Sequence, residues 1–254
     1  MSKRRLDLLL VERGLAETRT QAQALVMAGL VPGHTKPGEQ VDENAALEVE
    51  SLPPYVSRAG HKLANALDAF GVDVDGLDCL DVGASTGGFS DVLLQRGAAR
   101  VIALDVGYGQ LHDRVRRDPR VTVLERVNAR SLTELPFAPE VVTCDVSFIS
   151  VKLALPPALR LARPGWRSFV LVKPQFEAGR SEGPRGVVRD PAVHARVVHE
   201  VAEALLASGG EPRGVVDSGL PGPKGNREFV LFLVDTPEPR LPVEFDRWVD
   251  DAIS

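Results

Sequence analysis

The segment Leu80–Ser90, with the sequence LDVGASTGGFS, constrains the fold of this 254-residue chain more than any other. An apolar strand ends in an acid, continues into a glycine-rich turn and opens a helix. Glycines adopt positive φ angles and let a ligand approach the backbone closely, and the start of a helix presents unpaired N–H groups. A second apolar run, 101–104, ends in Asp105, whose carboxylate could accept the hydroxyls of a ribose. This pattern predicts a site for an adenosine-containing cofactor, and a tight turn without a ligand is the alternative.

The spacing of the glycines differs from that of a dinucleotide site. The fingerprint GxGxxG requires a glycine two positions after Gly83, where this chain has Ser85. The sequence DxGxxxGG instead resembles the first motif of methyltransferases that use S-adenosylmethionine (SAM). The resemblance implies a SAM site in this segment and at the following strand end, formed by Asp81, Gly83, Ala84, Ser85, Gly87, Gly88, Phe89, Asp105 and Val106.

Apolar runs alternate with longer amphipathic segments from Cys79 onward. We predict strands at 79–82, 101–104, 121–124, 141–144, 168–172, 213–217 and 228–234. We predict helices around 88–97, 108–117, 151–162 and 191–208. This alternation is typical of an α/β fold with a mainly parallel sheet and helices on both faces. Ligands of such sheets bind beyond the carboxyl ends of the strands.

Polar residues gather at those predicted strand ends. Asp145 follows one strand, Lys173 follows the next, and Glu228 begins the last one. Lys62 lies on the apolar side of a helix that we expect Ser57 to cap and Gly71 to end. Each could simply mark where solvent begins, and a lysine on a packed face can reach outward to water. If they converge instead, a second cation would favour the neutral, basic form of a lysine in the cleft.

These four residues match the Lys-Asp-Lys-Glu tetrad of the FtsJ/RrmJ-type ribose 2′-O-methyltransferases. With the motifs SRAGHKL, CDVSFIS, LVKPQFE and GPKGNRE, nearly the whole chain resembles the TlyA (haemolysin A) family. The resemblance implies a Rossmann-like SAM methyltransferase fold, with a seven-stranded, mainly parallel sheet whose last strand is antiparallel. It implies 2′-O-methylation of cytidine in 16S or 23S ribosomal RNA, or in both, with Lys173 as general base supported by Asp145, Lys62 and Glu228. The cofactor would also contact Asn128, Ala129 and Asp145.

Residues 1–50 form a separate small unit in this interpretation. A helix at 6–13 precedes a second helix that Thr18 caps, with Gln21 completing a capping box, and short strands follow at 30–33 and 41–49. The order resembles the S4 RNA-binding domain, which implies a small α+β module with a basic RNA-contacting face. The candidate contacts are Lys3, Arg4, Arg5, Arg13, Arg19 and Lys36, and an ordinary solvated charged surface is the alternative. The proline-containing segment 51–56 is the predicted linker to a methyltransferase domain at 57–254.

The segment 176–190 is long and combines glycines with arginines. We predict a mobile basic flap over the RNA, and a surface loop without this function is the alternative. The candidate RNA contacts of this domain are Arg58, Arg180, Arg185 and Arg189.

Composition narrows the function classes further. The net charge of −5 requires any RNA-binding surface to be local. No apolar run approaches the roughly 20 residues of a membrane span. Without a secretory signal, Cys79 and Cys144 are expected to be buried thiols of a cytoplasmic protein, and no metal site is predicted. The expected partners are ribosomal RNA or ribosomal subunits and no membrane.

Three other functions compete with ribose methylation. A ribosome-assembly factor could bind RNA without catalysis, although the complete tetrad disfavours it. A membrane-active haemolysin would be supported by a membrane-spanning helix or a secretory signal, and the sequence shows neither. A base methyltransferase commonly carries an Asn-Pro-Pro-Tyr motif, whereas this chain has Asp-Val-Ser-Phe at 145–148.

Overall fold

The computed structural model describes residues 3–27, 29–49, 54–179, 182 and 184–254. The chain divides into two compact units, Met1–Pro54 and Tyr55–Ser254. This division falls within the predicted linker 51–56, of which 51–53 lie outside the described residues. Arg180, a predicted RNA contact, also lies outside them.

The first unit packs two helices against a short two-stranded ribbon. Helices α1 (Leu6–Glu12) and α2 (Arg19–Met27) share an apolar core, and β1 (Lys3–Arg5) pairs antiparallel with β2 (Gln40–Asp42). The predicted strand at 30–33 is wrong. The amide of residue 30 donates to the carbonyl of residue 25, and that of residue 34 to the carbonyl of residue 31. This segment therefore forms two turns, and the strand that pairs with β2 is β1. The strand predicted at 41–49 is reduced to β2.

One predicted helix cap is confirmed and another is wrong. Thr18 Oγ1 accepts from the amide of Gln21 at 3.1 Å and so caps α2 as predicted, but the predicted capping box is incomplete because the Gln21 side chain accepts from the amide of Glu17 rather than from that of Thr18. Helix α3 (Ala59–Phe70) begins after Arg58, and Ser57 Oγ has no hydrogen-bond partner among the described residues, so the prediction that Ser57 caps α3 is wrong. Gly71 ends α3 as predicted, because it adopts the left-handed conformation with φ 61°.

The second unit is built on one mixed sheet. Among the described residues it has seven strands in the order β5-β4-β3-β6-β7-β9-β8. Their bounds are β3 Asp78–Val82, β4 Arg100–Asp105, β5 Val121–Glu125, β6 Val141–Cys144, β7 Arg167–Val172, β8 Gly210–Asp217 and β9 Phe229–Asp235. Strands β3 to β7 pair in parallel, and β9 is antiparallel to both of its neighbours. The predicted sheet, including its antiparallel last strand, is therefore confirmed.

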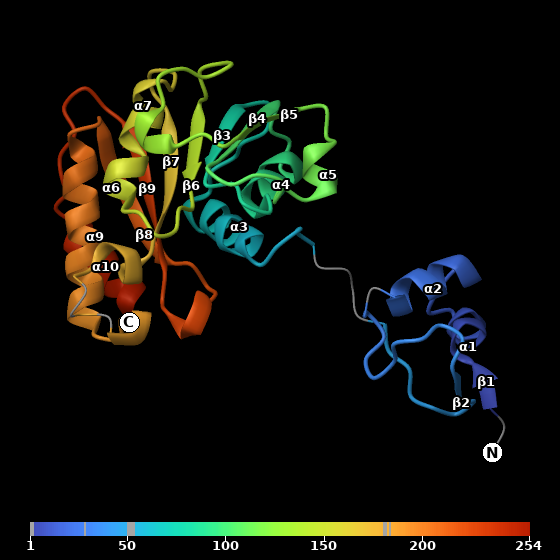
Figure 1. Cartoon of the computed structure of the whole chain (residues 1–254). Helices are drawn as coiled ribbons and strands as arrows, with labels where there is room; N and C mark the ends of the chain where they lie inside the picture. The colour runs from blue at the N-terminus through green and yellow to red at the C-terminus, as the bar shows by residue number, and fades with distance from the viewer. Residues whose placement is uncertain (1–2, 28, 50–53, 180–181, 183) are drawn as a thin grey trace. The chain divides into compact units, whose positions relative to one another are not determined.

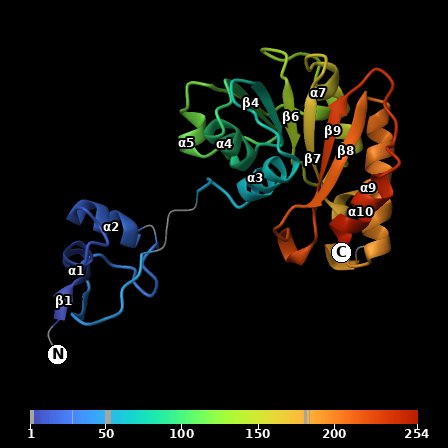
Figure 2. The same ribbon diagram turned by 180° about the vertical axis from the view of Figure 1, so that it is seen from behind.

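Helices cover both faces of this sheet (Figure 1). One face carries α3, α4 (Gly88–Gln95) and α5 (Asp113–Arg116). The other carries α6 (Val151–Ala154), α7 (Pro156–Arg160), α9 (Pro191–Leu206) and α10 (Phe245–Ile253). The edge strand β8 and its neighbours α9 and α10 are seen from behind in Figure 2. Pro156 divides the helix predicted at 151–162, because proline has no N–H to donate within a helix.

Alternation along the strands creates two apolar cores. Leu80, Val170 and Leu231 face the α6–α10 side, and their chain neighbours Cys79, Phe169 and Val230 face the α3–α5 side. Both cysteines are buried and free, and burial raises the pKa of Cys79 to about 12. None of the helices in the described ranges is long and apolar enough to cross a lipid bilayer.

Candidate active site

The glycine-rich turn brings the ends of two neighbouring strands into close contact. Gly83 has φ 85°, and its amide donates to the carbonyl oxygen of Leu104 at 2.8 Å. A Cβ atom at Gly83 would lie 2.5 Å from the carbonyl oxygen of Asp145, closer than any real Cβ contact. Glycine is therefore required here by the backbone that follows β6 as well as by the positive φ angle.

Asp81 fixes the start of α4 to the sheet. Its carboxylate is fully buried and accepts from the Ser90 amide at 2.9 Å, the Ser90 hydroxyl at 2.7 Å and the Thr143 hydroxyl at 3.1 Å. Burial, with a smaller contribution from the charge of Asp145, raises the pKa of Asp81 to about 7 against the hydrogen bonds from Ser90 and Thr143, which lower it. These bonds give Asp81 a positioning role beneath the glycine-rich turn.

Two adjoining cavities open at the carboxyl ends of β3, β4 and β6. The larger has a volume of about 470 Å³ and the smaller about 150 Å³, and they share Gly83, Ser85, Asp145 and Ser147. Of the predicted cofactor residues, the larger cavity is lined by Gly83, Ser85, Asp105, Val106, Asn128, Ala129 and Asp145. The smaller is lined by Asp81, Gly83, Ala84, Ser85, Gly88, Phe89 and Asp145. Gly87 lines neither; it has φ 91°, and a Cβ there would meet Leu111 at 2.8 Å.

The larger cavity suits a nucleoside. The Asp105 carboxylate is held by the amides of Ser85 at 2.8 Å and Gly107 at 2.6 Å, and it can still accept from a diol. Apolar walls at Val106 and Ile149 suit a flat ring. Its volume lies within the range of about 300–1,000 Å³ for small-molecule sites.

The smaller cavity adjoins the start of α4, an eight-residue helix whose first N–H groups favour an anionic ligand group. Asp81 and Asp145 line the same cavity and would favour a cationic group there. The two cavities together therefore suit a nucleoside that carries an amino acid.

The four predicted catalytic residues form two ion pairs. Lys173 Nζ lies 2.5 Å from Asp145 Oδ1 and donates to Ser147 Oγ at 2.9 Å. Lys62 donates to Glu228, and both side chains are buried. Lys62 therefore does not reach outward to solvent, which was the alternative left open by its position on α3.

Gln175 contacts the second of these ion pairs. Its Nε2 donates to the carboxylate of Glu228 at 3.0 Å, and it follows Lys173 by two positions in the short helix α8 (Pro174–Glu177). Lys173 and Asp145 line the smaller cavity together with Ser57, whereas Lys62 and Glu228 line neither cavity. The first pair thus lines a cavity, and the second is buried in the protein. Ser147 and Gln175 were not predicted, although both belong to the motifs CDVSFIS and LVKPQFE.

Phe148 is a further residue that the sequence did not single out. It lines the larger cavity, its side chain is 92% exposed, and its backbone has φ 65°. Its ring lies 5.1 Å from that of Phe176, and Lys173 Nζ lies 5.8 Å from the centre of the Phe176 ring. An exposed aromatic side chain on a strained backbone, beside the lysine, suits the stacking of a nucleobase.

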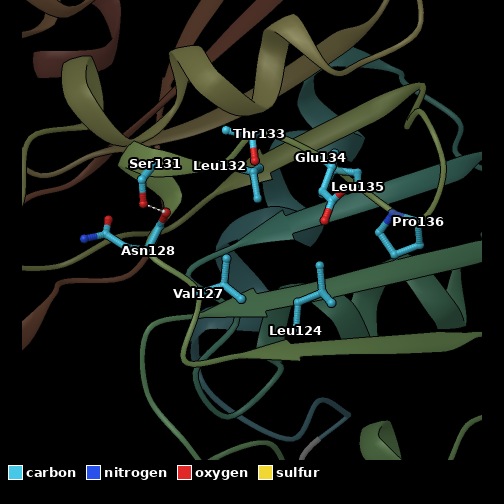
Figure 3. A pocket seen from close by; sticks show the side chains of 9 residues that line it. All are labelled: Leu124, Val127, Asn128, Ser131, Leu132, Thr133, Glu134, Leu135 and Pro136. Carbon is cyan, nitrogen blue, oxygen red and sulfur yellow. Dashed lines mark hydrogen bonds between the residues drawn. The ribbon is translucent and has the colours of Figure 1, made fainter.

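A third cavity lies behind the segment that follows β5 (Figure 3). It has a volume of about 450 Å³ and shares Val127 and Asn128 with the larger cavity. Ser131 Oγ donates to the carbonyl of Asn128 at 3.2 Å and stiffens this wall. Glu134 is the one ionisable residue that lines it, so the cavity holds no cluster of titratable groups.

In the first unit, buried Asp7 gathers several predicted RNA contacts. It accepts from Arg5 at 2.9 and 3.0 Å, from Arg19 at 2.9 Å and from Gln23 at 2.9 Å. The hydrogen bond from Arg5 is the main reason that the pKa of Asp7 lies well below its usual range. Arg5 and Arg19 are therefore held in place and partly neutralised.

The remaining cations of the first unit differ in their contacts. Arg4 pairs with Glu12, and Arg13 donates to two backbone carbonyl groups of the same unit. Lys3 and Lys36 are exposed, with neither a hydrogen bond nor an ion pair through their side chains in the described part of the chain. These two lysines are the most available for phosphate contacts.

The second unit exposes Arg58, Arg185 and Arg189. The guanidinium of Arg58 lies 3.4 Å from the carbonyl oxygen of Pro221, at the base of the loop that precedes β9. The predicted contacts that the structure describes in this unit are therefore accessible to a large polyanion.

Comparison with known proteins agrees with this geometry. Residues 55–234 match the FtsJ-like methyltransferase family, and residues 4–31 match the S4 domain. The chain is 49% identical to the 16S/23S rRNA (cytidine-2′-O)-methyltransferase TlyA of Mycobacterium tuberculosis, over 90% of this chain and 89% of that protein. A solved structure from Streptococcus thermophilus, described as a candidate hemolysin, is 40% identical, with a TM-score of 0.76 over 99% of this chain and 96% of that one.

The fold also resembles more distant methyltransferases. An S-adenosylmethionine-dependent methyltransferase from Mesorhizobium loti has a TM-score of 0.51 at 16% identity, over 69% of this chain and 98% of that one. At this identity the similarity concerns the fold alone. It confirms the predicted Rossmann-like architecture of the second unit.

Proposed function

Because the chain belongs to the FtsJ-like methyltransferase family, we propose that it methylates the 2′-hydroxyl of a cytidine ribose in 16S or 23S ribosomal RNA, or in both, with SAM as the methyl donor. The observation that carries this proposal is the Lys173–Asp145 pair at the wall of the smaller cavity. Asp145 and Ser147 hold Lys173 at the wall of a cavity that adjoins the nucleoside-sized one, a position suited to proton removal from a substrate hydroxyl.

The residues of the two cavities fit SAM. Asp105 would accept the ribose hydroxyls, and the apolar walls of the larger cavity would enclose the adenine. The backbone at the start of α4 would face the carboxylate, with the acids Asp81 and Asp145 near the cationic end. When bound, this cofactor supplies a methyl group made electrophilic by a sulfonium sulfur.

Lys173 is the proposed general base. In its neutral form Nζ would accept the proton of the 2′-hydroxyl, so that the ribose oxygen becomes a stronger nucleophile. Asp145 and Ser147 restrict the position of Nζ from two sides, which reduces the entropy lost when the substrate is aligned. Phe148 would stack on a base of the substrate strand and fix its ribose above Lys173.

Lys62 and Glu228 are proposed to support this base from behind. Their buried pair adds a positive and a negative charge, so the four groups together carry no net charge when all are ionised. Gln175 transmits the position of Glu228 to the helix that begins after Lys173. Lys62 would stabilise negative charge that develops on the substrate oxygen, with Glu228 holding it in place.

The first unit is proposed to bind RNA as an S4 domain, with Lys3 and Lys36 as its most available cations. The two units would divide the work between RNA binding and methyl transfer. A domain division at 1–50 and 57–254 remains part of this proposal.

The test is methyl transfer from labelled SAM to isolated ribosomal subunits, with the modified ribose mapped on the RNA. We expect Lys173→Ala to lose activity by about 10²–10⁴-fold while SAM binding persists. Arg160→Ala is the control, because Arg160 is an exposed cation of the same unit on α7 and lines neither cavity. Retained activity in Lys173→Ala would reject the base assignment. Subunit binding without any methyl transfer by the wild-type protein would favour the non-catalytic assembly factor.

A further inference from the structure

Two short turns of the second unit repeat one sequence and one conformation. The turn η2 (Pro184–Gly186) has the sequence Pro-Arg-Gly, and η3 (Pro223–Gly225) has Pro-Lys-Gly. Arg185 has φ 61° and ψ 18°, and Lys224 has φ 61° and ψ 15°. The same left-handed backbone thus presents a basic side chain in both turns.

This conformation is unfavourable for a residue with a side chain. Glycine adopts it without penalty, whereas other residues are strained there. Both side chains are exposed, and Arg185 forms neither a hydrogen bond nor an ion pair through its guanidinium in the described part of the chain. The Arg185 guanidinium therefore contributes no described contact to the fold, which leaves it available for contact with another molecule.

Asn226 joins the two turns into one rigid unit. It is buried, its Nδ2 donates to the carbonyl of Gly186 at 2.9 Å, and its Oδ1 accepts from the amide of Val188 at 3.0 Å. Its own carbonyl accepts from the amide of Gly222 at 2.8 Å. In addition, Lys224 Nζ donates to the carbonyl of Arg185 at 3.2 Å, which leaves two further N–H groups of this ammonium for a ligand.

The joined turns lie at the catalytic edge of the sheet. Asn226 precedes Glu228 by two positions, and Glu228 is paired with Lys62. The exposed Arg58 approaches the carbonyl of Pro221, next to the second turn. A positive surface therefore adjoins the active site of a chain whose net charge is −5.

We propose that Arg185 and Lys224 form a phosphate clamp for the RNA strand beside the nucleotide that is methylated, with Asn226 as its positioning residue. This inference rests on the proposed function, since it assigns the backbone contacts of the same substrate. Two cations held at a fixed separation suit a regularly spaced polyanion, and contacts to phosphates set the register of a strand without reading its bases.

The test compares removal of charge with relief of strain. We expect Arg185→Gln/Lys224→Gln to weaken binding to purified ribosomal RNA and to reduce the slope of log affinity against log salt by about 0.7–0.9 for each phosphate that is no longer neutralised. Arg185→Gly/Lys224→Gly should weaken binding equally, yet it should raise the midpoint of urea unfolding because glycine relieves both strained positions. Arg160→Gln is the matched control, because Arg160 is exposed on α7 and should leave the slope unchanged.

Asn226→Ala tests the coupling of the turns. Both cations remain in this variant, so a reduced salt slope would show that the clamp needs its fixed geometry. An unchanged affinity and slope in both double variants would overturn the clamp. Methyl transfer by the wild-type protein is measured in parallel. If the wild-type protein methylates the RNA but the double variants bind as it does, only the clamp is wrong. If the wild-type protein neither binds nor methylates the RNA, the proposed function itself fails.

Discussion

Replacing Asp81 by asparagine should stabilise the second unit at neutral pH while leaving its stability at acidic pH unchanged. The asparagine oxygen can accept from the amide and hydroxyl of Ser90, as the aspartate oxygen does. Its NH₂ group can donate to Thr143 Oγ1, whose own proton can then turn to the carbonyl of Leu80 at 3.4 Å. The substitution is therefore nearly isosteric, keeps the three hydrogen bonds of this side chain and removes a buried charge.

The magnitude follows from the pKa of Asp81. Burial raises it from 3.8 to about 7 in the folded protein, whereas the unfolded chain keeps the ordinary value. A pKa difference of about 3 corresponds to about 4 kcal/mol of unfolding free energy. Between these two values the folded state retains a proton that the unfolded state has released, so the wild-type protein loses stability as the pH rises from about 4 to 7. The asparagine side chain does not titrate, so the advantage of Asp81→Asn should grow from about zero at pH 4 to about 4 kcal/mol at pH 8.

Urea unfolding followed by tryptophan fluorescence measures this effect. Both tryptophans, Trp166 and Trp248, lie in the second unit, so the signal reports that unit alone. Asp251→Asn is the matched control, because Asp251 is exposed and should give no pH-dependent difference. A stability difference that is independent of pH, or a less stable Asp81→Asn variant at pH 8, would refute the assignment of a buried, destabilising carboxylate.

Four further changes have defined outcomes. Lys62→Met should cost about 3–5 kcal/mol in urea unfolding because Glu228 loses its buried cation, and adding Glu228→Gln should restore much of this stability without restoring methyl transfer. Gly83→Ala should lower SAM affinity, measured by calorimetry, since its Cβ would lie 2.5 Å from a backbone oxygen. Phe148→Ala should raise the KM for RNA by about 5–150-fold, from a stacking energy of about 1–3 kcal/mol, at unchanged melting temperature. Arg227→Met should increase amide hydrogen exchange in α10, because Arg227 donates to the carbonyl groups that end this helix.

Local patterns in the sequence predicted the architecture of the second unit well. Seven apolar runs with turn residues between them predicted its seven described strands, because a strand buried on both faces must be apolar throughout. The polar residues at the strand ends, such as Asp105 and Lys173, then had to meet at one sheet edge. The prediction failed where a short segment had several possible partners. The apolar run 30–33 could form a strand or a pair of turns from its sequence. Its hydrogen bonds, one of them to Leu25 near the end of α2, show that it forms turns.

The amino-acid sequence by itself thus determined the glycine-rich turn, the order of the elements and the chemical groups available at the catalytic edge. Only the tertiary structure decided which groups meet: Lys62 with Glu228 across 166 positions, Gln175 with the same Glu228, and Asn226 with both strained turns. Local propensity acts over a few neighbouring residues, whereas these contacts depend on strand order and on the packing of distant side chains. A pattern of residues can therefore identify a catalytic set, but the folded backbone decides its pairing.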